Sequence, residues 1–404
     1  MNPGMPTRPL RILEIAGSLS ARSAARILAA MGADVVRVEP VRGDSFGGSA
    51  PAEVDPATAA YFDSGKRSIA IDITRAAGAA ALVELTKHAD ALIEDLGPHI
   101  LEALELAPGR LLSSNANLAI VRISPFGHEG PRASWAATEL TIQAMGGVTQ
   151  ATGYSGEPPF RLPGFPAHYI AGLNAALAVA GAVLGAESGT ESGAEIHISM
   201  EHAYMHHWVR HIQQWACSGH DLPREPRGEG RQGFPHTVRA ADGWIYLLAL
   251  YTDWESLAAF LELDQFATSE WGNPGTREGR WEEIEPHFNR AIERRPRYQW
   301  LADAAEYGYT FAPVHEMSEL ASSPQAEARE AFTPFEWDGT KLLTPSLPFK
   351  EQNGEAGSRY VPRKGEHTLE VLTEWGLEKT HVAKLIGDGL AGEGAEANLQ
   401  RRRS

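Results

Sequence analysis

Short apolar runs alternate with stretches of helical spacing along the first half of the chain. Apolar runs bounded by turn residues predict buried strands, and apolar positions three and four residues apart predict helices between them. The predicted strands span 11–16, 34–39, 68–72, 91–94, 118–124 and 195–200. One helix is predicted to begin at the N-cap Ser20, and further helices are predicted at 76–87, 101–106 and 169–185. Strand–helix–strand units imply parallel strands joined by right-handed crossovers. The pattern therefore predicts an α/β fold.

The pattern changes after a polar stretch at 219–236 that is rich in Pro, Arg and Gly, which we interpret as a linker. Beyond it, Asp242-Gly243 separates two strand-like runs, which is a hairpin signal. These strands are predicted at 237–239 and 244–249, followed by helices at 254–261, 281–294 and 300–307 and a strand at 311–315. The second half therefore predicts a smaller α+β domain over 237–335. Helices are predicted again at 369–375 and 381–386, and the tail 400–404 is expected to be disordered.

Composition narrows the class of protein. The chain has 404 residues, a net charge of −16 and one cysteine, Cys217. This acidity argues against a nucleic-acid or anionic-membrane partner, and the single cysteine excludes an intrachain disulfide and fits a reducing cytoplasm. We expect no signal peptide, because residues 1–9 lack an apolar core. We also expect no membrane span, because the longest apolar run, 175–186, is too short.

Two titratable residues stand at the starts of two predicted helices. Glu139 begins a short helix, where exposed backbone N–H groups favour a carboxylate. His168 lies in the turn that begins the long, small-residue helix. The loop between them is rich in Thr, Gly, Ser and Pro, and such loops commonly carry sites. From the residues alone, the pair is either a catalytic site or a helix-start carboxylate and an unrelated turn residue.

Three further groups have the residue types of binding sites. The turn at Gly17 and Ser18 lacks the Gly-x-Gly-x-x-Gly of dinucleotide folds, so NAD and FAD are not predicted, although an anion could bind at the helix start. Lys66 and Arg67 suit either a solvated turn or a phosphate contact. A run of histidines has i, i+4 spacing but no evident third ligand, so no metal site is predicted. These histidines are His202, His206, His207 and His211.

Five segments in order along the chain carry a resemblance to a known family. They are GADVVRVEP at 32–40, GKRSIAID at 65–72, ADALIED at 89–95, SPFGHEGP at 124–131 and GEHT at 365–368. Together they resemble the family III CoA-transferases, a group that includes carnitine, formyl and bile-acid CoA-transferases and the 2-methylacyl-CoA racemases.

The resemblance implies a large Rossmann-like domain built from both chain ends, 1–218 and 336–404, with the small domain between them. It also implies an interlocked homodimer that takes coenzyme A or acyl-CoA and a small carboxylic acid as substrates, with no tightly bound cofactor. The positions implied to contact CoA are Gly17, Ser18, Arg42, Lys66, Arg67, Arg75, Asp95 and Leu96. Asp95-Leu96 stand where Asn-Phe is common in the family.

The resemblance also implies a mechanism. An aspartate in a pattern like Ala-Asp-x-x-x-Gly attacks the acyl-CoA carbonyl, a mixed anhydride forms, and CoA then attacks to give an aspartyl thioester, which is nucleophilic catalysis. In this chain His168 stands in place of that aspartate, within AHYIAG at 167–172. Glu139 matches a carboxylate position found in many members. The racemase branch has a histidine just before that position, where this chain has Thr138.

Three hypotheses follow. The first is a CoA-transferase in which Glu139 accepts the acyl group beside His168. The second is an acyl-CoA racemase, isomerase or lyase, in which His168 moves a proton and Glu139 orients it. The third is a non-catalytic CoA-binding or regulatory homologue that retains the dimer.

Overall fold

The computed structural model describes residues 8–43, 46, 54–189, 192–221, 224, 237–248, 253–348 and 360–392. Two compact units divide the chain. The large unit comprises Met1–Thr149, Arg161–Gly219 and Ala331–Ser404, and the small unit comprises Gln150–Phe160 and His220–Glu330. Residues 150–160, which the sequence analysis placed in the first part of the large domain, thus fall within the small unit. The predicted linker at 219–236 and the tail at 400–404 lie largely or wholly outside the described residues.

A seven-stranded sheet organises the large unit. Its strands are β1 Arg11–Ile15, β2 Asp34–Glu39, β3 Arg67–Ile71, β4 Ala91–Glu94, β5 Ala119–Ser124, β6 Glu195–Ser199 and β12 Ala391–Gly392. The order is β12-β3-β2-β1-β4-β5-β6, and all neighbours pair in parallel except β12 with β3. The predicted α/β fold with parallel strands is confirmed. The strand order reverses between β1 and β4, and ligands of open parallel sheets bind at such a point.

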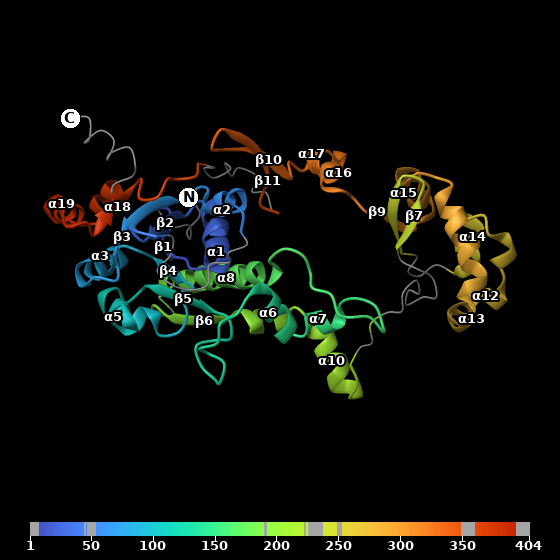
Figure 1. The fold of residues 1–404 in the computed structure, drawn as a ribbon, viewed down its shortest axis with the longest axis horizontal. Helices are drawn as coiled ribbons and strands as arrows, with labels where there is room; N and C mark the ends of the chain where they lie inside the picture. Colours follow the sequence, from blue (N-terminus) through green and yellow to red (C-terminus); the bar gives the residue numbers. More distant parts are fainter. Residues whose placement is uncertain are drawn as a thin grey trace. The chain divides into compact units, whose positions relative to one another are not determined.

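Helices cover both faces of this sheet. The helices of the large unit are α1 Leu19–Ala30, α2 Pro56–Asp63, α3 Ala76–Thr86, α4 Ile100–Ala103, α5 Pro108–Ser114, α6 Glu139–Met145, α8 Pro166–Glu187, α9 Met200–His206, α10 Val209–Ser218, α18 Thr368–Glu374 and α19 Lys379–Gly387. Residues of α1 and α8 form one apolar core with the sheet, and residues of α3, α5, α18 and α19 form the other. Figure 1 shows α1 and α8 lying side by side. Their backbones approach closely at Gly172, where a Cβ would lie 1.9 Å from the Ser23 hydroxyl oxygen.

Two helix starts differ from the prediction. Ser18, not Ser20, is the N-cap of α1, because the Ser18 side chain accepts a hydrogen bond from the Ser20 N–H. The long helix α8 begins at Pro166 rather than at residue 169, since proline lacks an N–H and its fixed φ suits the first helical position. This earlier start places His168 in the first turn of α8 rather than in a preceding turn.

The length of α8 also corrects an expectation. Among the described residues, α8 is the one helix long and apolar enough to cross a membrane by length and composition, with 22 residues. The longest apolar run predicted from the sequence, 175–186, is shorter than this helix. Ala171, Ala175 and Val179 on this helix are fully buried in the core that α8 shares with α1. This face of α8 therefore packs into the core of the large unit.

The small unit combines a three-stranded sheet with helices (Figure 1). Its strands are β7 Thr237–Ala240, β8 Gly243–Leu248 and β9 Thr310–Pro313. The pairing of β7 with β8 is antiparallel, which confirms the predicted hairpin. Its longer helices are α11 Trp254–Phe260, α14 Trp281–Glu293 and α15 Arg297–Tyr307, and its shorter ones are η1 Asp264–Phe266, α12 Ser269–Gly272, α13 Pro274–Gly279, α16 Met317–Ala321 and α17 Pro324–Ala328. The short helix α7 Val148–Ala151 crosses into this unit, and the hairpin β10 Phe332–Trp337 with β11 Thr340–Pro345 belongs to the large unit.

Candidate active site

Glu139 begins α6 because the residue before it caps the helix. The Thr138 hydroxyl accepts a hydrogen bond from the Thr141 N–H, and the Thr141 hydroxyl accepts one from the Thr138 N–H. This reciprocal capping satisfies backbone donors at the start of the helix. It also fixes Glu139 as the first helical residue, and its side chain turns inward and is buried.

His168 occupies the first turn of α8, where backbone N–H groups have no partner within the helix. Two of these groups donate to Glu139: the Ala167 N–H to Oε1 at 3.0 Å and the His168 N–H to Oε2 at 3.3 Å. The carboxylate of α6 is therefore the anion that occupies the positive N-terminus of α8. The same helix start brings the imidazole to Glu139.

The two side chains meet directly. Nδ1 of His168 lies 2.7 Å from Oε2 of Glu139, and both residues are only 6% exposed. Burial by itself would raise the pKa of the Glu139 carboxyl. Hydrogen bonds from the His168 side chain, the Ala167 N–H and the Gln143 side chain outweigh that effect and hold this pKa below its usual value. Glu139 is therefore ionised at neutral pH.

Gln143, which the sequence analysis did not single out, completes the shell around the carboxylate. Its Nε2 donates to Oε1 of Glu139 at 2.8 Å and to the Leu162 carbonyl at 3.1 Å, and its Oε1 accepts from the Leu162 N–H at 2.9 Å. The signal that could have found it is its i, i+4 spacing from Glu139, which puts both side chains on one face of a helix.

This arrangement leaves one reactive atom. A carboxylate beside Nδ1 accepts the proton on that nitrogen, so the lone pair of the neutral imidazole resides on Nε2. No described residue forms a hydrogen bond with Nε2 of His168, whose ring meets Phe165 edge-on at 6.1 Å between centroids. Both oxygens of Glu139 already accept hydrogen bonds. The site can therefore act as a base or nucleophile at Nε2, with Glu139 stabilising the imidazolium.

The positions expected to contact CoA at the first turn come together, but they bind each other. The Asp95 carboxylate accepts hydrogen bonds from the N–H groups of Gly17, Ser18 and Ala21 and from the Ser18 hydroxyl. The anion position at the start of α1 is thus filled by a carboxylate of the chain itself. Leu96 is buried, and its N–H donates to Glu94 at 2.8 Å.

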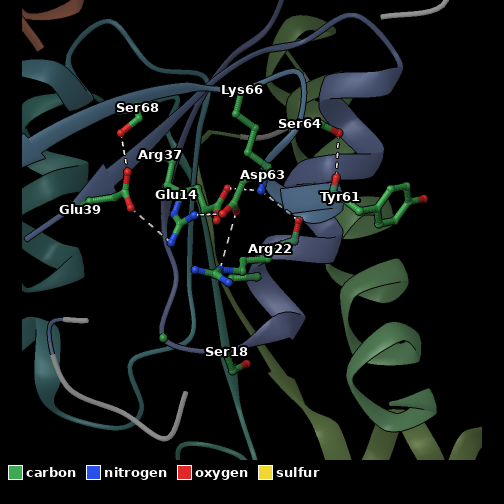
Figure 2. A network of polar contacts seen from close by, with 12 residues as sticks. Glu14, Ser18, Arg22, Arg37, Glu39, Tyr61, Asp63, Ser64, Lys66 and Ser68 are labelled. Atoms are coloured by element: carbon green, nitrogen blue, oxygen red, sulfur yellow. Dashed lines mark hydrogen bonds and ion pairs between the residues drawn. The ribbon is translucent and has the colours of Figure 1, made fainter. Parts of the chain in front are cut away.

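Lys66 and Arg67, expected at a phosphate, have carboxylate partners instead. Nζ of Lys66 lies 2.5 Å from Oε2 of Glu14 and 3.1 Å from the Arg22 carbonyl, and the side chains of Lys66 and Glu14 are fully buried (Figure 2). Arg67 pairs with Asp34 at 2.5 Å and with Glu374 at 2.6 Å. Since both charges are already neutralised, neither residue is positioned as a free anion contact.

Figure 2 shows that the Lys66 pair belongs to a larger charged network. Arg37 bonds Asp63 and lies 3.4 Å from Glu39, and Arg22 lies 3.7 Å from Asp63. Burial raises the pKa of Glu14 and lowers that of Lys66, and each partner's charge opposes the shift of the other. The network joins α2 to the strands β1 and β2, so its role in this structure is to hold the fold.

The remaining predicted cations are Arg42 and Arg75, which are both exposed. They form no ion pair with any residue that the structure describes. Of the predicted cations, these two alone remain available to an anion. The histidines of α9 and α10 join no group of three His, Cys, Asp or Glu residues suited to a metal ion within the described parts of the chain.

Comparisons with known proteins agree with this architecture. The CoA-transferase family III model matches residues 8–368. The BbsE subunit of succinyl-CoA:(R)-benzylsuccinate CoA-transferase from Thauera aromatica is 30% identical, covering 94% of this chain and 96% of its own. The alpha-methylacyl-CoA racemase of Mus musculus is 27% identical, covering 98% and 100%. A CAIB/BAIF family protein from Brucella suis superposes with a TM-score of 0.78 at 24% identity, covering 92% and 100%, and supports the fold. The resemblance inferred from the sequence is confirmed.

Proposed function

Because the chain belongs to CoA-transferase family III, we propose that it acts on an acyl-CoA thioester and that His168 is the reacting group. One observation carries this proposal. The Glu139 carboxylate accepts hydrogen bonds from Gln143, Ala167 and His168, while no described residue bonds Nε2 of His168. A histidine whose Nδ1 is held in this way by a carboxylate is suited to proton transfer at Nε2.

The chemistry best supported is proton transfer at the carbon next to the thioester carbonyl. Nε2 of His168 would take the proton from that carbon, and the C–H electron pair would become an enolate with its charge on the thioester oxygen. The imidazolium formed would be stabilised by Glu139 at Nδ1. Protonation of the enolate at the opposite face of the same carbon would complete a racemisation, and protonation at a conjugated carbon would complete an isomerisation. The similarity to an alpha-methylacyl-CoA racemase supports this class of reaction.

CoA transfer is the second candidate, because the named relatives include transferases that act on succinyl-CoA and formyl-CoA. In that reaction an oxygen of Glu139 would attack the acyl carbonyl and CoA thiolate would leave, giving a mixed anhydride. The thiolate would then attack the glutamyl carbonyl and release the first carboxylic acid, and an acceptor acid would reverse these steps. The hydrogen bonds that Glu139 accepts in this structure lower the nucleophilicity of its oxygens. One oxygen would therefore first have to lose its hydrogen bonds.

One experiment separates these reactions. The protein is mixed with a panel of acyl-CoAs in heavy water, with and without a carboxylic acid acceptor. The masses of the acyl chain and of the intact protein are then measured by mass spectrometry. Deuterium entering the acyl chain without an acceptor supports proton transfer at His168. A hydroxylamine-sensitive mass gain at Glu139 would instead establish CoA transfer. Binding of CoA with neither signal would favour a non-catalytic homologue.

A homodimer is part of the same proposal. Leu173, Leu177 and Leu184 lie along one face of α8 and are 58%, 70% and 60% exposed. Three exposed leucines at helical spacing form an apolar stripe that a second copy would cover. Light scattering on the purified protein should give twice the 43.7 kDa mass of the chain, and Leu177→Lys should shift it toward the monomer.

A further inference from the structure

Gln143 is one helical turn from Glu139 and is completely buried. Its amide forms hydrogen bonds at both ends, all to buried or partly buried groups. A buried amide of this kind is costly to leave unpaired. Its hydrogen bonds are therefore fixed features of the fold, and one of them acts directly on the Glu139 carboxylate.

The Leu162 peptide decides which end of the amide faces Glu139. The Leu162 N–H requires an acceptor and its carbonyl requires a donor, and Gln143 supplies them with Oε1 and Nε2 respectively. If the amide were flipped, its oxygen would face two acceptors, the Leu162 carbonyl and Oε1 of Glu139. The loop before α8 thus holds Gln143 with its NH₂ group toward the carboxylate.

We propose that Gln143 is a positioning residue, locked by the Leu162 backbone, that occupies one oxygen of Glu139 and leaves the other directed at His168. This inference rests on the proposed function of the His168–Glu139 pair. Gln143 and the Ala167 N–H together occupy Oε1. Oε2 is then the oxygen that remains for the imidazole, and it accepts from Nδ1 at 2.7 Å.

Hydrogen bonds to an ionised carboxylate favour that form. The other titratable groups that act on Glu139 are His168 and Tyr169 from α8 and Tyr204 from α9. Both tyrosines are neutral at the pH of interest, because burial raises the pKa of each, that of Tyr204 to about 12. Removal of the Gln143 donor should therefore be seen directly as a higher protonation midpoint at Glu139.

The test compares wild type with Gln143→Met, which keeps the length and removes the donor, and with Gln143→Glu, which keeps the shape and places a second carboxylate beside the first. Carboxyl ¹³C resonances of glutamate-labelled protein are followed against pH, and Glu139 is assigned by its loss in Glu139→Gln. The midpoint should rise by about one pH unit in Gln143→Met. It should rise further in Gln143→Glu, where two adjacent carboxylates must share a proton. Exposed Gln299, changed to Glu, is the matched control and should leave the midpoint unchanged.

In each variant, the acid limb of the pH profile of deuterium exchange should shift from its wild-type position by the same amount as the Glu139 midpoint. A Glu139 midpoint that stays at its wild-type value in both variants, with native far-ultraviolet circular dichroism, would overturn the proposal. A role in packing alone would lower stability without moving the midpoint. Failure of the proposed function is distinguishable, because it would appear as absent exchange in the wild type while the ¹³C midpoints still shift.

Discussion

Oε2 of Glu139 lies 2.7 Å from Nδ1 of His168, although the two residues are 29 positions apart in the sequence and come from different helices. The pair joins the starts of α6 and α8, and backbone donors of α8 hold the same carboxylate. A carboxylate that accepts hydrogen bonds at both oxygens is better suited to stabilising a histidine than to acting as a nucleophile itself.

Glu139→Gln should lower α-proton exchange by about 10²- to 10⁴-fold, because a neutral amide cannot stabilise the imidazolium and can favour the wrong tautomer. The measurement is the rate of deuterium entry into the acyl chain of a substrate acyl-CoA. Glu129→Gln, at an exposed position, is the control and should retain the wild-type rate. Unchanged exchange in Glu139→Gln would remove Glu139 from the mechanism.

His168→Asp tests whether the rest of the site suits CoA transfer. The substitution should reduce exchange by about 100-fold or more, since the base at Nε2 is lost. It places a carboxylate where the family nucleophile stands, so a hydroxylamine-sensitive adduct should form with acyl-CoA. His168→Asn, which has similar size and no nucleophilic carboxylate, should form none. If His168→Asp gives no adduct while it still binds CoA, the site is not adapted to transfer.

Lys66→Met should destabilise the protein by about 3–5 kcal/mol, because it leaves Glu14 buried with its charge partner removed. Urea unfolding monitored by tryptophan fluorescence measures this loss. The double variant Glu14→Leu, Lys66→Met should recover most of it, since an apolar pair can replace a buried ion pair. Lys87→Met, at an exposed pair with Glu84, should change stability by no more than about 0.5 kcal/mol. A loss equal to that control would contradict the assigned structural role of Lys66.

His128 should make stability depend on pH. Burial and the charges of Arg122 and His197 lower its pKa from 6.5 to about 4, although Glu195 and Glu102 oppose this. A lowered folded pKa gives stability that is present above pH 6.5 and is lost as pH falls toward 4, by less than about 3 kcal/mol because the partly exposed ring is screened by solvent. Urea midpoints measured across that range should fall less steeply in His128→Gln. The exposed control His381→Gln should keep the wild-type slope, and an equal slope in both variants would refute this assignment.

Asp95→Ala should free the N–H groups that the carboxylate now satisfies at the start of α1. Loss of such a cap should cost about 1–2 kcal/mol of folding stability. Inorganic phosphate should then raise the thermal midpoint of the variant more than that of wild type, because the vacated position suits an anion. Asp388→Asn, at an exposed position, is the control. Equal responses to phosphate would show that Asp95 does not block an anion there.

Local patterns predicted most of the elements of the fold. The strands of the parallel sheet, the β7–β8 hairpin and the main helices follow from the spacing of apolar residues, because that spacing reflects which face of each element is buried. Boundaries were less well determined. In the structure α8 begins at Pro166, whose fixed φ suits the first helical position, and α1 is capped by Ser18, whose side chain accepts from the Ser20 N–H.

The family, the α/β class and the titratable residues in the first turns of α6 and α8 could be predicted from the chain, since each is a property of local composition and order. The packed structure alone settles the partners of the polar groups. It paired Lys66 with Glu14, Asp95 with Gly17, and Gln143 with Leu162, all far apart in the sequence. Such contacts depend on strand order, register and side-chain direction together, and these are set only when the sheet and its helices have packed.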